Sequence, residues 1–137
     1  MQQSFDRQRA MATIGARLGR VAAGEVDIEL PFRDDLTQQH GFLHAGILGA
    51  VLDSACGYAA YSLMPPDAAV LSIEFKVNLL APARGELVIA RGRVKKAGRT
   101  IMVCDADAFA VTGGVEKLVA SMTGTMMVVT GRSDLLG

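Results

Sequence analysis

The sequence has no excess of charge of either sign, because fourteen Lys and Arg residues balance fourteen Asp and Glu residues. Proteins that bind nucleic acids draw much of their affinity from neutralising phosphates, which requires a basic surplus. We therefore expect no nucleic-acid partner. Half of the 137 residues are hydrophobic. A chain of this size has the length of one domain and leaves part of that apolar surface for another subunit to cover.

Cysteine is also scarce. The two cysteines, Cys56 and Cys104, lie within apolar runs and form no paired framework of the secreted type, which indicates a reducing compartment. A signal peptide is not indicated either, because Asp6, Arg7 and Arg9 fall where it would need an apolar core. We expect a cytoplasmic protein.

Several catalytic motifs are missing. The sequence contains no G-x-S-x-G elbow, no Walker A loop and no dinucleotide-binding fingerprint after a strand. It therefore gives no support to a serine hydrolase or a nucleotide-dependent enzyme. The two histidines, His40 and His44, have no metal-ligand spacing with each other or with the cysteines. We expect neither a metal ion nor a cofactor.

One apolar stretch is long enough to compare with a membrane span. Residues 44–64 are almost free of charge, and about 20 apolar residues cross a bilayer. The stretch is rich in small residues, however, and Asp53 lies in its middle, where a carboxylate would be costly in lipid. We expect no membrane partner. The stretch predicts a helix over about 46–63, buried within the protein and ended by Pro65 and Pro66.

The rest of the sequence predicts one further helix and five strands. Apolar residues at near-helical spacing predict an N-terminal helix over residues 2–18, before a core that begins at about residue 22. Alternating patterns predict strands at about 26–32, 71–79, 86–96, 100–112 and 116–129. The last four are joined by short turns and predict an antiparallel meander. The chain as a whole, residues 1–137, predicts a single α+β domain in which a curved antiparallel sheet wraps the long helix.

Asp53 is the first candidate for a catalytic residue. On the predicted helix its neighbours at spacings of three and four are all small, namely Gly49, Ala50, Cys56 and Gly57. A carboxylate on such a stripe can lie at a seam where another backbone or a slender ligand approaches, and a buried carboxylate there suits a general base. The alternative is a structural carboxylate, held by a backbone amide or by an arginine of a partner.

The start of the long helix, His44-Ala45-Gly46, is the second candidate. The first N–H groups of a helix have no partner within it, so small residues leave them open to a ligand. A carbonyl oxygen placed there would have its developing negative charge stabilised, as in an oxyanion hole. An ordinary helix start explains the same pattern. His44 competes with Asp53 as the base, although a structural role, donating an N–H to a loop carbonyl, explains it better.

A basic group of residues is the third candidate. Arg91, Arg93 and Lys95 share one face of a predicted strand, and the turn that follows is basic as well. Clustered cations near an open turn can hold phosphates. The alternative, which explains the pattern better, is an exposed face on which these charges pair with Asp105 and Asp107 across the sheet.

These residues, in this order, resemble the PaaI-like branch of the hotdog-fold thioesterases over residues 22–130. The resemblance rests on three segments: Gln38 to Gly46 with Asp53 nine positions beyond His44, Leu71 to Gly85, and Lys95 to Thr100. The sequence departs from the family pattern at Ala45, where glycine is usual, and at Gln38, where asparagine is common.

The resemblance implies a hotdog fold and the hydrolysis of an acyl-CoA thioester. It implies that Asp53 activates water or attacks the carbonyl carbon directly, and that Ser72 positions the water. The backbone N–H groups of Ala45 and Gly46 would form the oxyanion hole. The turn that would hold the nucleotide end of CoA consists of Lys96, Ala97, Gly98, Arg99 and Thr100.

Further expectations follow from the same resemblance. His44 and Gln38 would shape the site around the thioester carbonyl. Family members assemble as dimers with active sites at the subunit seam and often pair into tetramers, so we expect a homo-oligomer. An aromatic acyl group, of the phenylacetyl or hydroxybenzoyl type, and a medium-chain acyl group both remain open. Two alternatives for the function are a non-catalytic acyl-CoA-binding regulator and a hotdog hydratase or dehydratase.

Overall fold

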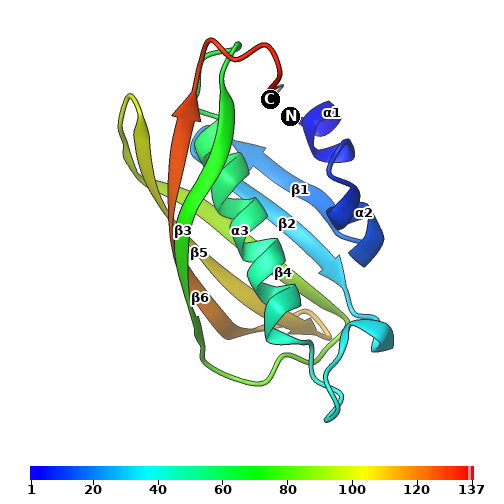
Figure 1. Ribbon diagram of the computed structural model, residues 1–137. Helices are drawn as coiled ribbons and strands as arrows, with labels where there is room; N and C mark the ends of the chain where they lie inside the picture. The colour runs from blue at the N-terminus through cyan, green and yellow to red at the C-terminus, as the bar shows by residue number, and fades with distance from the viewer. Residues whose placement is uncertain (136) are drawn as a thin grey trace.

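A curved antiparallel sheet wraps one long helix in the computed structural model, which describes residues 1–135 and 137 (Figure 1). The helices are α1 (Gln2–Asp6), α2 (Arg9–Ile14) and α3 (Ala45–Tyr61), with a 3-10 turn, η1 (Asp34–Leu36). The strands are β1 (Arg17–Ala22), β2 (Glu25–Pro31), β3 (Ala69–Leu79), β4 (Leu87–Ala97), β5 (Ile101–Thr112) and β6 (Val115–Val129). The predicted α+β architecture is confirmed, and the predicted strands and long helix match to within about two residues.

The concave face of the sheet presents small side chains to α3. They include Ala90, Gly92, Cys104, Ala106, Ala108, Ala110, Ala120 and Gly124, all buried. These small residues allow the helix to lie close to the strands. At the closest point, a Cβ added to Gly92 would lie 2.3 Å from the carbonyl oxygen of Ala55 on α3. The helix therefore lies close to the strands where the side chains beneath it are small.

Replacing Gly92 by Ala is expected to destabilise the fold strongly. The added methyl group overlaps the backbone of α3, which has no free rotation to escape it, and overpacking of this kind costs about 1–3 kcal/mol or more. Chemical denaturation measures the change in the free energy of unfolding. Gly57→Ala is the matched control, because a Cβ at Gly57 meets nothing within 4 Å and adds helix propensity. Equal stability of the two variants would contradict the close contact.

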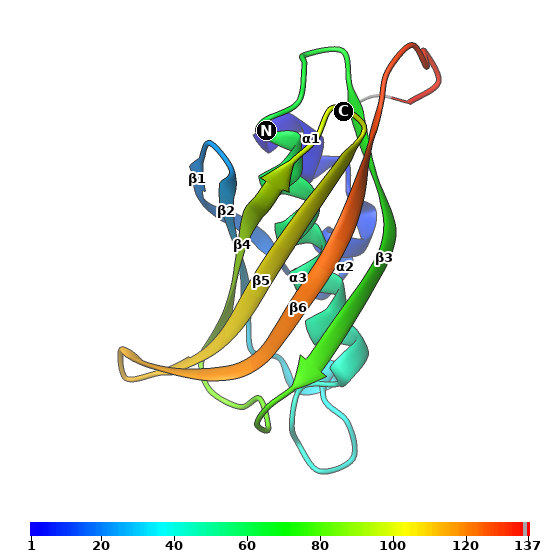
Figure 2. The ribbon, with the colours of Figure 1, turned by 90° about the vertical axis from the view of Figure 1, so that its left-hand side faces the viewer.

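The strands follow one another in the sheet in the order β1-β2-β4-β5-β6-β3, and each neighbouring pair is antiparallel (Figure 2). β4, β5 and β6 form the predicted meander. The prediction is wrong for β3, which pairs with β6 at the edge of the sheet instead of with β4. The connection between β3 and β4 passes below the start of α3, where the N–H of Leu43 donates to the carbonyl oxygen of Ala83 at 2.9 Å. The turn-forming residues of this connection do not indicate that it passes from the edge strand β3 to the far side of β5.

The helix predicted over residues 2–18 is also wrong in part. α1 ends at Asp6, and α2 ends at Ile14, followed by the C-cap residue Gly15, whose φ of 78° is the left-handed conformation that terminates helices. The chain then enters β1, which the sequence did not predict. β1 is an edge strand whose pairing shifts between Leu18 and Val21, so its side chains show no regular alternation.

A β-bulge in β3 changes which side chains face the helix. Ser72 pairs with Met126 and Phe75 pairs with Gly124, and both partners belong to the buried face of β6. Ser72 and Phe75 thus lie on the same face of the sheet, although three positions separate them and regular alternation would place them on opposite faces. The extra residue in the bulge turns the Ser72 side chain towards α3.

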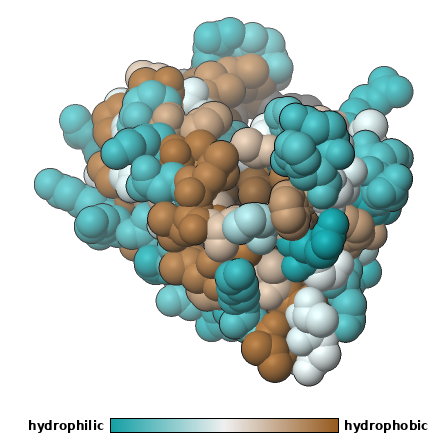
Figure 3. Space-filling view, turned by 90° about the horizontal axis from the view of Figure 1, so that it is seen from below, coloured by the Kyte–Doolittle hydropathy of each residue, from teal (hydrophilic) through white to brown (hydrophobic). Residues whose placement is uncertain are grey.

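The edge strand β3 leaves large apolar side chains exposed. Leu71, Ile73, Phe75 and Leu79 each have between 47% and 55% of their surface accessible. The edge of β3 that faces away from β6 pairs with no strand in the described part of the chain. Figure 3 looks at the molecule from the end where α3 begins and shows apolar residues gathered into a patch there. Such surfaces mark sites of association.

Candidate active site

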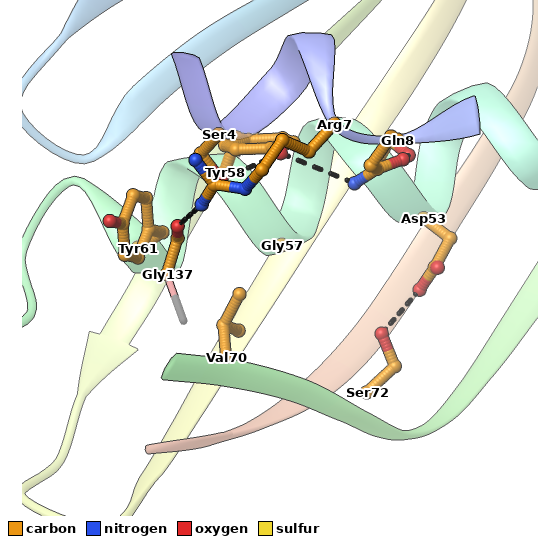
Figure 4. A pocket seen from close by; sticks show the side chains of 11 residues that line it. Ser4, Arg7, Gln8, Asp53, Gly57, Tyr58, Tyr61, Val70, Ser72 and Gly137 are labelled. Atoms are coloured by element: carbon orange, nitrogen blue, oxygen red, sulfur yellow. Dashed lines mark hydrogen bonds between the residues drawn. The ribbon is translucent and has the colours of Figure 1, made fainter. Parts of the chain in front are cut away.

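Asp53 and Ser72 meet midway along α3. The Oγ of Ser72 donates a hydrogen bond to Oδ1 of Asp53 at 2.7 Å (Figure 4), and the same hydroxyl lies 3.3 Å from the sulfur of Met126. Asp53 is half-buried on the side of α3 that the sheet leaves open. Because the serine occupies only Oδ1, Oδ2 remains able to accept a proton from a water molecule.

A cavity of about 290 Å³ extends from this pair along the C-terminal half of α3 (Figure 4). Its lining consists of Ser4, Arg7, Gln8, Asp53, Ser54, Gly57, Tyr58, Tyr61, Val70, Ser72 and Gly137. The segment of α1 and α2 covers one side of it. Gly57 has no side chain to fill the space, so the cavity is open beside the turn of α3 that follows Asp53. We call it the α3 cavity.

The start of α3 is capped by its own histidine. His44 is the N-cap residue, and its Nδ1 accepts a hydrogen bond from the N–H of Gly46 at 2.8 Å. His44 thus has a structural role as a helix cap through an acceptor nitrogen, and the predicted donation to a loop carbonyl is not among the hydrogen bonds of the described residues. The cap occupies the N–H of Gly46. The N–H of Ala45 donates to no group within the described part of the chain.

Alanine fits at position 45 without strain. Among the described residues, every residue with a positive φ is a glycine, so Ala45 has an ordinary negative φ in the first turn of α3. The departure from the glycine that is usual in the family thus leaves both the helix start and its N–H in place.

A second cavity, of about 380 Å³, lies at the start of α3. It is lined by Gln38, Phe42, Leu43, Ala45, Leu48, Leu79, Leu80, Ala81, Pro82 and Ala83. Gln38 and Ala45 therefore line the same cavity, whereas His44 lines neither this cavity nor the α3 cavity. The side-chain oxygen of Gln38 accepts a hydrogen bond from the N–H of His40, which fixes the loop before α3.

The two groups of site residues lie in different parts of the molecule. Asp53 lies eight positions beyond Ala45 on α3, which is about 12 Å along a helix that rises about 1.5 Å per residue. A reacting carbonyl needs its oxyanion donor within hydrogen-bonding distance and the attacking water within about 3.5 Å. One chain therefore does not bring the base and the oxyanion donor to the same carbonyl group.

The arginines of β4 pair with acidic residues on the outer face of the sheet. Arg91 makes two hydrogen bonds of 2.7 Å to Glu116, and Arg93 lies 2.6 Å from Asp105 and 3.4 Å from Asp107. The Arg91 guanidinium holds the pKa of Glu116 below its usual range through these hydrogen bonds. The predicted cross-sheet pairing is confirmed for Arg93, whereas Arg91 takes Glu116 in place of the predicted partners.

The turn between β4 and β5 stays exposed. Lys96, Ala97, Arg99 and Thr100 are accessible to solvent, and Gly98 is half-buried. A Cβ on Gly98 would lie 2.2 Å from the carbonyl oxygen of Ile101, so this turn requires glycine. Within the described residues, Lys96 and Arg99 form no ion pair, which leaves two cations at the end of the molecule where α3 finishes.

Metal-ligating residues do not gather anywhere among residues 1–135 and 137: no group of three His, Cys, Asp or Glu is placed to hold an ion. In the same residues, none of the helices is both long and apolar enough to cross a membrane. Cys56 and Cys104 are buried free thiols. Burial raises the pKa of the Cys104 thiol to about 11 and also raises that of Cys56.

Both thiols are expected to be unreactive in the folded protein. The thiolate is the reactive species, and a raised pKa keeps the thiol protonated at pH 8. A chromogenic disulfide reagent should detect no protein thiol in the native state at this pH and two after unfolding in guanidinium. Rapid labelling of the native protein would show that one cysteine is accessible. Because the native protein thiols are expected not to react, the same reagent can be used to follow the release of CoA.

Fold and site together define a class of protein: a hotdog domain with a carboxylate on its central helix. A family model described as the thioesterase superfamily matches residues 40–117, which is more than half of the chain. The chain therefore belongs to the thioesterase superfamily. The resemblance to the hotdog-fold thioesterases and the hotdog fold that it implied are confirmed. The match supports a thioesterase function.

Individual relatives agree with this assignment. The crystal structure of a thioesterase family protein from Silicibacter pomeroyi has 54% sequence identity and a TM-score of 0.92, covering 94% of this chain and 95% of that one. A candidate esterase of Halobacterium salinarum is 31% identical over 110 residues, 77% of this chain and 72% of that protein. The Escherichia coli PaaI protein of the phenylacetic acid degradation operon shares the fold, with a TM-score of 0.82 at 19% identity, over 94% of this chain and 90% of that one.

The N-terminal segment contributes three residues to the α3 cavity that the sequence did not predict: Ser4, Arg7 and Gln8. They belong to the N-terminal segment, where the pattern predicted one continuous helix. No motif connects this segment with Asp53, since the two are brought together only when α1 and α2 pack on α3.

Proposed function

We propose that the protein hydrolyses acyl-CoA thioesters to a free acid and CoA, with Asp53 as the general base. The observation that carries the proposal is the hydrogen bond from Ser72 to Asp53 at the mouth of a cavity. Ser72 holds Oδ1 of the carboxylate, and Oδ2 takes a proton from a water that attacks the carbonyl carbon. The tetrahedral intermediate collapses, the C–S bond breaks, and the proton returns to the departing thiolate.

The oxyanion hole of each site is provided by a second copy of the chain. Ala45 and Asp53 lie about 12 Å apart within one protomer, too far for both to act on one carbonyl. Gly49 lies midway between them, and although its backbone is buried in one chain, a Cβ added there would meet nothing within 4 Å. Two α3 helices that cross antiparallel near Gly49 bring Ala45 of each protomer to Asp53 of the other.

The exposed edge strand supports the same arrangement. Antiparallel pairing of β3 with β3 of a second copy joins the two sheets and covers Leu71 and Phe75, each about half exposed in one chain. The two cavities then meet at the seam, the polar one beside Asp53 and the apolar one beside Ala45 of the partner protomer. We propose a dimer as the catalytic unit, with pairing of dimers into tetramers as the larger assembly.

The turn from Lys96 to Thr100 is proposed to hold the nucleotide of CoA. Lys96 and Arg99 are its two cations, and CoA carries phosphates that such cations bind. Arg91 and Arg93 take no part, because acidic side chains of the sheet already neutralise them. The buried free thiols suit a reducing compartment, so the cytoplasm is the proposed location.

A panel of acyl-CoA substrates tests the proposed function. Thiol release is measured for aromatic and medium-chain acyl groups, and enoyl-CoA hydration is followed in parallel. We expect thioester hydrolysis without added metal or cofactor. Tight acyl-CoA binding by calorimetry with no thiol release would indicate a non-catalytic regulator, and hydration without thiol release would indicate a hydratase; either result overturns the proposal.

A further inference from the structure

Ser72 holds the carboxylate of Asp53, but its own strand holds Ser72 only weakly. The residue lies on the edge strand β3, next to the bulge, and its side chain is accessible to solvent in one chain. A serine side chain has three staggered positions, and its neighbours decide which of them is occupied. The hydrogen bond to Oδ1 of Asp53 requires one of the three (Figure 4). A neighbour that closes the other positions would keep the hydroxyl group on Asp53.

Met126 is such a neighbour. Its sulfur lies 3.3 Å from Oγ of Ser72, while Oδ1 of Asp53 lies 2.7 Å from the same oxygen. Met126 on β6 is the cross-strand partner of Ser72 and is fully buried. A thioether is a weak hydrogen-bond acceptor, whereas a carboxylate is a strong one. The methionine therefore fills the space beside the hydroxyl group without drawing its proton away from Asp53.

The surroundings of Met126 keep its flexible side chain in this position. A methionine has three rotatable side-chain bonds and follows the shape of the space around it. On the inner face of the sheet, Met126 lies between its two cross-strand partners, Ser72 on β3 and Met102 on β5. Its terminal methyl group lies over Gly124, where an added Cβ would come within 3.0 Å of Cε. The missing side chain of Gly124 thus provides the room that the end of Met126 occupies.

We propose that Met126 is a positioning residue, which holds the hydroxyl group of Ser72 on Oδ1 of Asp53. The inference rests on the proposed function, in which Oδ2 of the same carboxylate takes a proton from water. Without the contact, Ser72 turns among its staggered positions, and the carboxylate loses the hydrogen bond that fixes its orientation. Misplacement of a reacting group slows the chemical step. The contact therefore acts on kcat and leaves substrate binding unchanged.

Met126→Val tests the proposal, because valine suits a strand but lacks the atom that contacts Ser72. We expect kcat for a good acyl-CoA substrate to fall about threefold, since the serine is then free to occupy three staggered positions, and KM to stay unchanged. Met122→Val is the matched control. Met122 lies on the same face of β6 and is equally buried, but its partner on β3 is Val77. Equal kcat values in the two variants overturn the inference.

The same substitution in a Ser72→Ala background separates positioning from general packing. Ser72→Ala alone should lower kcat at least as much as Met126→Val does. With the hydroxyl group absent, Met126→Val should cause no further loss of kcat, because the two residues act through one contact. A further loss in the double variant would show that Met126 acts by another route. Full activity in Ser72→Ala would show that the hydroxyl group has no role. Either result overturns the inference.

Two further variants keep the inference testable if Met126→Val does not fold, and thermal unfolding checks each of them. Gly124→Ala displaces the methyl group of Met126 without removing it and should lower kcat. Met126→Leu keeps an apolar atom at the δ position and should retain most of the wild-type kcat. The opposite order of these two kcat values overturns the inference. A wild-type enzyme whose kcat is independent of Met126 loses only this inference, whereas no turnover of any acyl-CoA means that the proposed function itself has failed.

Discussion

Replacing Asp53 by Asn is expected to lower thiol release from a good acyl-CoA substrate by about 10²- to 10⁴-fold, the range that a positioned general base contributes. Asparagine has the same shape and can still accept the hydrogen bond from Ser72, but its amide takes no proton from water. The loss should therefore appear in kcat, with little change in the affinity for a non-hydrolysable acyl-CoA analogue.

Asp67→Asn is the matched control, because Asp67 is exposed in the loop after α3 and lines neither cavity. It should retain full activity. Retained turnover in Asp53→Asn would remove Asp53 from its proposed role. A single turnover in ¹⁸O-labelled water tests direct attack: label found in Asp53 would show that the carboxylate formed an anhydride with the acyl group and that water opened it at the Asp53 carbonyl.

Replacing Ala45 by Pro is expected to lower kcat by about 10²- to 10³-fold, the effect of removing one oxyanion donor. Proline lacks the backbone N–H, and the first position of a helix is where it is best tolerated. His44 has a φ of −62° and a ψ of 138°, the extended conformation that a residue before proline adopts. The variant thus removes a single donor and keeps α3.

Ala45→Gly is the control for this variant, since glycine keeps the N–H and is the residue usual in the family. It should have nearly full activity, and both variants should unfold at temperatures close to that of the wild type. Full activity in Ala45→Pro would contradict the oxyanion hole at this position. The N–H of Gly46 would then be the candidate oxyanion donor, and it would have to give up its hydrogen bond to His44.

The central helix shows what could be predicted from sequence. Its length, its burial and its end before Pro65 followed from an uncharged run that is too polar in the middle for a membrane. Asp53 stood out for the same reason, as the one carboxylate in that run. Both conclusions needed only local information: composition, spacing and a terminating proline.

β3 shows why the rest could not be predicted. The alternating pattern of β3 predicts a strand. Nothing in the pattern predicts the bulge that turns Ser72 towards the helix, and no turn residue indicates that β3 pairs with β6. Both depend on pairing with strands about 50 residues away. The contact between Gln8 and Ser54 could not be predicted for a similar reason, because only the packing of the N-terminal segment on α3 creates that side of the cavity.

The division of each site between two protomers is tested most directly by subunit complementation. Asp53→Asn and Ala45→Pro are each nearly inactive alone, and co-expression with different affinity tags yields mixed dimers. In a mixed dimer one site carries both substitutions and the other carries neither. If the base and the oxyanion donor come from different chains, a random mixture recovers about one quarter of the wild-type activity, all of it in the mixed dimers. Mixed dimers as inactive as their parents would show that each site is built within one chain, and the account would be wrong.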